Sequence, residues 1–83
     1  MLKLTKAADK QLKVLQRKQA KFSESVRNAI IAIGENPTTG KKLTGNLKGK
    51  YSYRVGRGFR IIYEISGGVV VILTLTPRRD AYR

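Results

Sequence analysis

Two neighbouring segments, residues 51–56 and 59–65, alternate between apolar and polar side chains, which is the period of half-buried β-strands. The core-facing positions are Tyr51, Tyr53 and Val55 in the first segment and Phe59, Ile61, Tyr63 and Ile65 in the second. Arg57 and Gly58 turn the chain between them. A strand that buries one face holds the other face at fixed positions. That other face carries Ser52, Arg54, Arg60, Ile62 and Glu64.

The N-terminal half of the chain predicts two amphipathic helices, the first beginning near Lys6 and the second following a turn at residues 18–21. Their apolar stripes are Ala8, Leu12 and Leu15 in the first helix and Phe22, Val26, Ala29, Ile30 and Ile33 in the second. Gly34 is expected to end the second helix in the left-handed C′ conformation, and Pro37 cannot continue it. Helices of this length need a sheet to cover their apolar stripes.

The remaining elements complete a single domain over residues 1–83. Leu2–Thr5 is a short first strand, and Ser66-Gly67-Gly68 is a hairpin signal because glycine accepts positive φ. Val69–Thr76 is apolar on both faces, as expected of a central strand, and Pro77 ends it. The order β-α-α-β-β-β predicts an α+β fold, with a helical hairpin packed on a mainly antiparallel four-stranded sheet.

The charge balance is strongly basic, with 18 lysines and arginines against five carboxylates and a net charge of +13. An anionic partner relieves such self-repulsion, so RNA, DNA, an anionic membrane and an acidic protein all qualify. The chain has no cysteine and no histidine, and its carboxylates are scattered, so we expect no metal and no cofactor. Its longest apolar run, Val69–Leu73, is too short to span a bilayer. We expect a cytoplasmic protein without a membrane partner.

The polar face of the predicted hairpin points to nucleic acid. The stretch from residue 41 to 60 contains seven cations and no carboxylate. Hairpin pairing brings Arg54 and Arg60 together, which is unfavourable unless an anion bridges them. The alternative is that both extend into solvent on an ordinary exposed sheet face.

The C-terminal tail adds Arg78, Arg79 and Tyr82 beyond the last strand, next to the same face. Without histidine or metal ligands, the nuclease route left is attack by an RNA 2′-hydroxyl on its own adjacent phosphate, with arginines stabilising the developing charge. Tyr82 is a candidate general acid or base. Its alternative role is a terminal aromatic that caps the core.

Three segments together resemble the RelE/ParE toxin superfamily. They read LTGNLKGKYSYRV at residues 43–55, FRIIYEI at 59–65 and RRDAYR at 78–83. The resemblance implies a RelE-like, microbial-RNase-type fold and a toxin neutralised by a cognate acidic antitoxin, which alone would read the operator DNA. RelE-type members are ribosome-dependent, metal-independent endoribonucleases that cut mRNA in the ribosomal A site and so inhibit translation.

The resemblance assigns catalytic roles by position. Arg54 and Arg60 would hold the scissile phosphate, Arg79 would stabilise the transition state, and Tyr82 would orient the base or transfer a proton. Some relatives have a lysine, a candidate general base, where this chain has Ser52. Lys48, Lys50 or Tyr82 would then have to act in its place.

Other cations are candidate contacts to mRNA and ribosomal RNA. They are Lys41, Lys42, Lys48, Lys50, Arg57, Arg78 and Arg83, together with a stripe on the first helix formed by Lys6, Lys10, Lys13 and Arg17. The stripe has an alternative interpretation as an ordinary solvated helix face. Two other functions also stay open for the whole chain: a ParE-like inhibitor of DNA gyrase without nuclease activity, and a nucleic-acid-binding module without toxicity.

Overall fold

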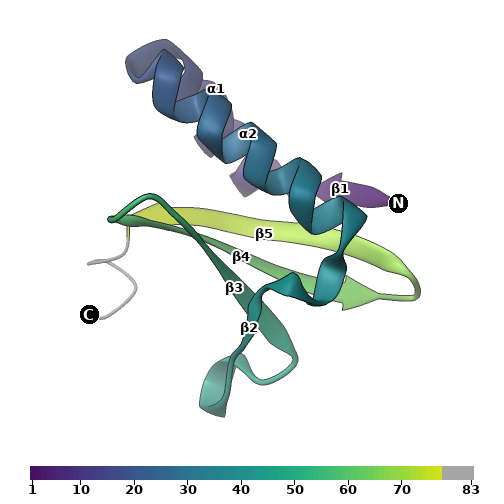
Figure 1. The fold of residues 1–83 in the computed structure, drawn as a ribbon. Coiled ribbons are helices and arrows are strands. Elements are labelled where there is room, and N and C mark those ends of the chain that lie inside the picture. The colour runs from purple at the N-terminus through teal and green to yellow at the C-terminus, as the bar shows by residue number, and fades with distance from the viewer. Residues whose placement is uncertain (78–83) are drawn as a thin grey trace.

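A computed structural model describes residues 1–77 and shows a helical hairpin packed on one face of a five-stranded sheet (Figure 1). The elements in chain order are β1 (Leu2–Leu4), α1 (Lys6–Lys18), α2 (Ala20–Glu35), β2 (Lys41–Lys42), β3 (Lys50–Val55), β4 (Phe59–Ser66) and β5 (Val69–Pro77). Two short 3-10 helices flank β2, namely η1 (Pro37–Thr39) and η2 (Gly45–Leu47). The predicted α+β class is confirmed, and the predicted elements occur in the predicted order, but the sheet has five strands rather than the predicted four.

The strands lie in the order β1-β5-β4-β3-β2. Only β1 pairs in parallel, with β5, and the other neighbours are antiparallel. The strand that the sequence did not predict is β2, where Lys41 pairs with Ser52 and Lys42 with Tyr51. Two lysines give no apolar alternation, so the pattern did not reveal a strand. A short, charged edge strand also discourages pairing with other chains.

The helices begin and end for local reasons. Thr5 caps α1, because its hydroxyl oxygen accepts from the Ala8 N–H (3.1 Å) while the hydroxyl donates to the Leu73 carbonyl of β5 (2.8 Å). The predicted turn between the helices is confirmed but is reduced to one residue, Gln19. The expectation for Gly34 was wrong, since it lies inside α2 and α2 continues to Glu35. Helix α2 ends because Asn36 has a non-helical backbone conformation and Pro37 follows it.

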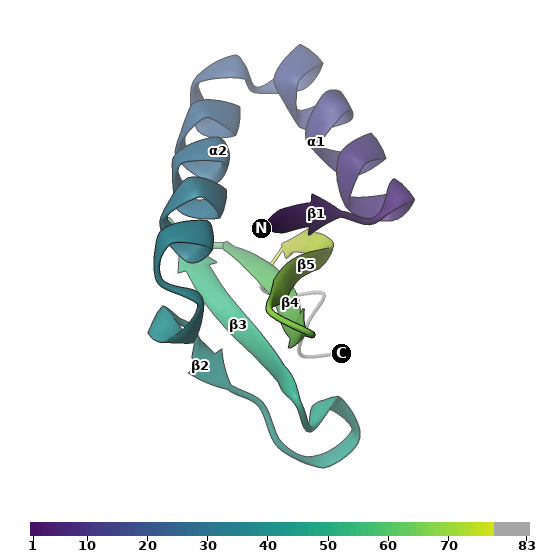
Figure 2. The same cartoon turned by 90° about the vertical axis from the view of Figure 1, so that its right-hand side faces the viewer.

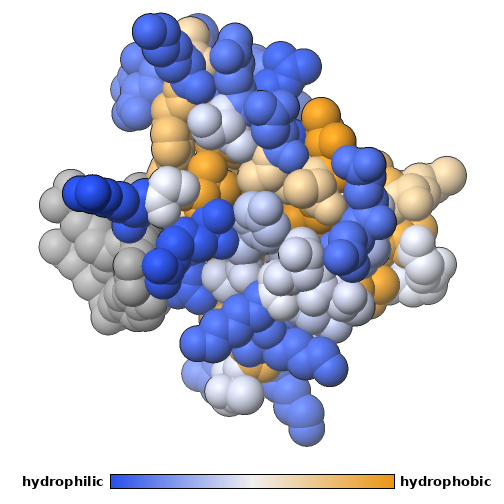
Figure 3. Space-filling view, in the orientation of Figure 1, coloured by the Kyte–Doolittle hydropathy of each residue, from blue (hydrophilic) through white to orange (hydrophobic). Residues whose placement is uncertain are grey.

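The core lies between the helices and the sheet. The two predicted apolar stripes are confirmed, with the buried and partly buried members all packed in one cluster. Tyr63, Ile61, Ile72, Ile33 and Val26 are the largest fully buried side chains. On the face shown in Figure 3, apolar surface is visible between the helices and the sheet, whereas the surface at the top of the helical layer is hydrophilic.

The end of β5 extends past β1 and therefore has a strand neighbour on one side only. Gln11 of α1 compensates for the missing neighbour. Its Oε1 accepts from the Leu75 N–H (2.8 Å) and from the Thr74 hydroxyl (3.2 Å). This pair of bonds ties α1 to Thr74 and Leu75 of β5, which pair with Ile62 and Ile61 of β4.

Tyr63 joins the sheet to the segment between α2 and β2. Its hydroxyl donates to the Pro37 carbonyl (2.8 Å) and accepts from the Gly40 N–H (2.9 Å). A Cβ on Gly40 would collide with that hydroxyl and would lie 3.0 Å from the Ser52 carbonyl oxygen. Glycine at position 40 therefore lets the chain pass close enough for β2 to pair with β3.

We expect Gly40→Ala to lower the free energy of unfolding by about 1–3 kcal/mol, the usual cost of overpacking a tight contact. The measurement is urea unfolding at neutral pH. Gly58→Ala is the matched control, because no atom lies within 4 Å of a Cβ built there. Equal midpoints for the two variants would show that the Gly40 contact is not tight.

Burial raises the pKa of Tyr63 above its ordinary value of 10.0; the Gly40 hydrogen bond lowers it, and Tyr51 and Tyr53 raise it further. Below about pH 10 both folded and unfolded chains keep the phenol proton, so the protonated Tyr63 hydroxyl contributes fully to the free energy of unfolding. Above that pH the unfolded chain ionises first, and the effect is lost as the pH approaches the folded pKa. The stability gap between wild type and Tyr63→Phe should therefore narrow above pH 10 in urea unfolding. A constant gap up to pH 11 would contradict a raised pKa.

Candidate active site

The β3–β4 hairpin places two arginines side by side on the outer face of the sheet, the face away from the helices. Gly56 makes the turn with φ of +62°, a conformation that favours glycine. The register pairs Val55 with Phe59 and Arg54 with Arg60. The predicted meeting of Arg54 and Arg60 is therefore present in the structure.

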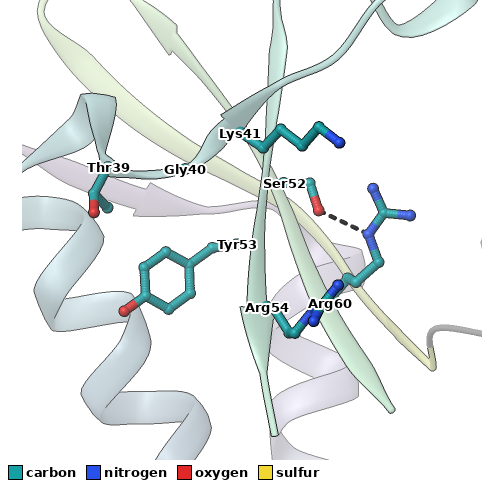
Figure 4. Close-up of a pocket in the computed structure, with 7 residues that line it drawn as sticks. All are labelled: Thr39, Gly40, Lys41, Ser52, Tyr53, Arg54 and Arg60. Carbon is teal, nitrogen blue, oxygen red and sulfur yellow. Dashed lines mark hydrogen bonds between the residues drawn. The ribbon is translucent and has the colours of Figure 1, made fainter. Parts of the chain in front are cut away.

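Ser52 orients one of these arginines. The Nε of Arg60 donates to the Ser52 Oγ at 2.7 Å, and Ser52 is only 8% exposed (Figure 4). Arg60 itself is half-buried, whereas Arg54 is exposed. A hydrogen bond from a charged donor to a buried hydroxyl restricts the guanidinium to a narrow range of orientations. Ser52 thus acts on the site through Arg60.

These residues line a hollow of about 320 Å³ at the outer edge of β3. Lys41, Ser52, Arg54 and Arg60 lie on one side of β3, and the Tyr53 ring lies on the other (Figure 4). Thr39 and Gly40 complete the lining. Among residues 1–77, three cations and no carboxylate line the space, so its chemistry suits a phosphate group.

Thr76 adds a buried hydroxyl next to the arginines. It pairs with Arg60 across β4 and β5, and its Oγ1 has no hydrogen-bond partner among the described residues. Burying a hydroxyl without a partner costs about 1–3 kcal/mol, and such groups concentrate at functional sites. Its position in register with Arg60 extends the polar part of the outer face onto β5.

The other predicted contact residues fall into separate places. Lys42, Lys48 and Lys50 line a second hollow, beneath the loop that contains η2. Arg57 is exposed at the β3–β4 turn. The four cations of the helical stripe, Lys6, Lys10, Lys13 and Arg17, are exposed on α1, where Lys13 forms an ion pair with Asp9 at 3.1 Å. Of all predicted contact residues in the described chain, only Lys41 joins Arg54 and Arg60.

Four predicted residues, Arg78, Arg79, Tyr82 and Arg83, lie outside the described residues. Within residues 1–77, no group of three or more histidine, cysteine or acidic side chains is placed to hold a metal ion. Over the same range, no helix has the length and apolar character needed to cross a membrane.

Sequence reasoning identified the arginine pair but missed three residues that shape the site. The bond from Arg60 to Ser52, the tight passage at Gly40 and the buried Thr76 hydroxyl were not foreseen. A usable signal existed for Ser52, because it shares the outer-face period with Arg54. Gly40 and Thr76 gave no local signal.

Comparison with protein families places this chain in a known class. A family model described as the ParE toxin of the type II toxin–antitoxin system parDE matches residues 2–82. The chain therefore belongs to this toxin family, within the RelE/ParE superfamily, and is the toxin of a toxin–antitoxin pair. The resemblance seen in the sequence is confirmed. No curated protein matches the chain in sequence.

Solved structures share the fold. A YoeB/ParE toxin from Agrobacterium tumefaciens is 22% identical with a TM-score of 0.83, over 92% of this chain and 95% of that one. The RelBE2 toxin–antitoxin complex from Mycobacterium tuberculosis is 26% identical with a TM-score of 0.78, over 94% and 96%. A YoeB–YefM complex from Staphylococcus aureus is 21% identical with a TM-score of 0.79, over 92% and 93%.

The paired arginines make a prediction about stability. Like charges directly opposite each other on neighbouring strands destabilise a sheet by about 0.2–1 kcal/mol. Arg54→Gln should therefore raise the free energy of unfolding by that amount at low ionic strength. The gain should vanish in 0.5 M salt, because salt at that concentration screens charges beyond roughly 5 Å.

The measurement is urea unfolding at both salt concentrations, with Arg57→Gln as the control that removes an equal charge from an exposed turn. Added inorganic phosphate should stabilise the wild type more than Arg54→Gln. If Arg54→Gln lowers stability at low salt, or if Arg57→Gln behaves in the same way, the two guanidinium groups do not repel each other.

Proposed function

We propose that the chain is a ribosome-dependent, metal-independent endoribonuclease that cleaves mRNA in the ribosomal A site. The observation that carries this proposal is the pairing of Arg54 and Arg60, with Arg60 oriented by Ser52, at the edge of a cationic hollow. Holding like charges together at a cost in stability is reasonable where an anion must be bound. The enzyme would act in the cytoplasm, where it meets translating ribosomes.

The proposed reaction uses the RNA as its own nucleophile. The 2′-oxygen attacks the adjacent phosphorus, the bond from phosphorus to the 5′-oxygen breaks, and a 2′,3′-cyclic phosphate and a 5′-hydroxyl form. One proton leaves the 2′-hydroxyl and one is given to the 5′-oxygen. Arg54 and Arg60 neutralise the charge that builds on the non-bridging oxygens, and fixed donors of this kind lower a barrier by about 3–4 kcal/mol each. Arg79 is proposed to share this role.

The proton transfers need a group other than Ser52. Its hydroxyl accepts from Arg60, and Lys48 and Lys50, which the sequence offered as substitutes, line the second hollow instead. Tyr82 is therefore the proposed proton-transfer residue. Lys41, which lines the first hollow, is proposed to contact the flanking phosphate.

The proposed partners are a cognate acidic antitoxin, the mRNA and ribosomal RNA. Solved relatives were captured with an antitoxin, as in the YoeB–YefM and RelBE2 complexes. Figure 1 shows α1 in the helical layer on one face of the sheet. The cationic stripe of α1 is exposed, and Arg54 and Arg60 pair on the outer face of the sheet. With Lys6, Lys10, Lys13 and Arg17 on ribosomal RNA, the opposite side of the molecule would be left for the mRNA.

A second candidate function is inhibition of DNA gyrase without nuclease activity. It is favoured by the family model, whose description is that of a ParE toxin. A gyrase inhibitor has no need of arginines oriented at a cationic hollow, so the outer face of the sheet separates the two functions.

The proposal predicts which variants lose toxicity. Arg60→Ala, and Arg79→Ala combined with Tyr82→Phe, should each reduce mRNA cleavage in cells at least 100-fold and abolish growth arrest on induction. Arg27→Ala is the control, because it removes an exposed arginine of α2 that is not among the candidate RNA contacts and does not line the hollow. Circular dichroism checks that each variant is folded. Growth arrest that survives these changes, together with inhibited supercoiling by purified gyrase, would establish the second function instead.

A further inference from the structure

The second hollow, of about 600 Å³, lies beneath the loop that contains η2. Figure 2 shows this loop projecting beyond the rest of the sheet. The hollow is lined mostly by apolar surface, to which Leu43 and Tyr51 contribute. The candidate active site makes no use of this hollow.

The backbone around the hollow is held in one conformation. Gly45 and Gly49 adopt φ of +67° and +91°, which restricts both turns to glycine. The Leu43 N–H bonds the Lys50 carbonyl at 2.9 Å, and the Lys48 N–H bonds the Gly45 carbonyl at 3.1 Å. On the sheet side, the Tyr51 ring stacks on Tyr63 with centroids 5.2 Å apart. The hollow is therefore formed in advance of any ligand.

Three lysines, Lys42, Lys48 and Lys50, surround the apolar lining. None of them forms an ion pair with another described residue, although Lys50 lies opposite Glu64 in the sheet. An apolar surface with an unpaired cationic rim is complementary to an apolar side chain flanked by carboxylates.

We propose that this hollow, which we call the anchor pocket, receives an apolar side chain from an acidic segment of the antitoxin. This inference rests on the proposed pairing with an antitoxin but not on the nuclease activity. An RNA base fits less well, because the base carries both donors and acceptors. The side chains around the pocket offer it ammonium donors and the hydroxyls of Thr44 and Tyr51, but no carboxylate or amide group.

The anchor pocket adjoins the candidate active site across a single strand. Lys41 and Lys42 are consecutive on β2, so their side chains point to opposite faces; Lys41 lines the first hollow and Lys42 the anchor pocket. A peptide anchored beside Lys42 therefore needs to pass only the edge strand to cover Arg54 and Arg60. The anchored side chain would provide affinity for the antitoxin, and the rest of the peptide would neutralise the toxin by covering Arg54 and Arg60.

The test uses synthetic peptides and the full chain. One peptide has a central leucine between glutamates, and the second has glycine in place of the leucine. Binding is measured by calorimetry, and the site is mapped by backbone amide NMR shifts. We expect the leucine peptide to bind at least fivefold more tightly than the glycine peptide and to shift residues 42–51.

Lys48→Glu should weaken binding of the leucine peptide at least fivefold. Lys10→Glu, an equal charge change on α1, should change the affinity for the leucine peptide less than twofold. Leu43→Asp, checked for folding by circular dichroism, should abolish the preference for leucine. Equal binding of the two peptides, equal effects of Lys48→Glu and Lys10→Glu, or no binding would each overturn the proposal. Displacement of the leucine peptide by oligouridylate, with the same NMR shifts, would assign the pocket to RNA instead.

Discussion

The cross-strand register of β3 and β4 is the constraint on which the site depends. Because Val55 pairs with Phe59 around a turn that begins at Gly56, Arg54 must lie opposite Arg60. The same register places the aromatic residues on the helical side, where Tyr63 is fully buried and holds the segment before β2. A one-residue slip would move every one of these side chains to the wrong face. The core and the cationic face are thus two results of one pairing.

Much of this arrangement was predictable from the sequence because it follows from local rules. Alternation at residues 51–55 and 59–65 determines faces, and a short turn determines register, which together place Arg54 beside Arg60. The bond from Arg60 to Ser52 depends on side-chain rotamers, and the passage at Gly40 depends on a tyrosine 23 residues away. Such contacts leave no local pattern. At Gly34, the expectation failed because glycine permits a helix end without requiring one.

The two hollows adjoin across the edge strand β2, and each has its own proposed function. The first gathers Lys41, Arg54 and Arg60 around a space of about 320 Å³, and the anchor pocket surrounds an apolar lining with lysines. In the proposed function, the toxin binds RNA when it is active and an acidic antitoxin when it is silent. Two adjoining cationic surfaces of different polarity meet both needs, because apolar lining distinguishes the protein partner from the nucleic acid.

The most direct measurement of the central claim is to map mRNA ends by primer extension after adding the purified chain to a bacterial translation extract, with and without ribosomes. Our account predicts cuts within codons that appear only when ribosomes are present, each leaving a 2′,3′-cyclic phosphate. Intact mRNA in the presence of translating ribosomes would contradict the account, and so would cleavage that is equally strong in their absence.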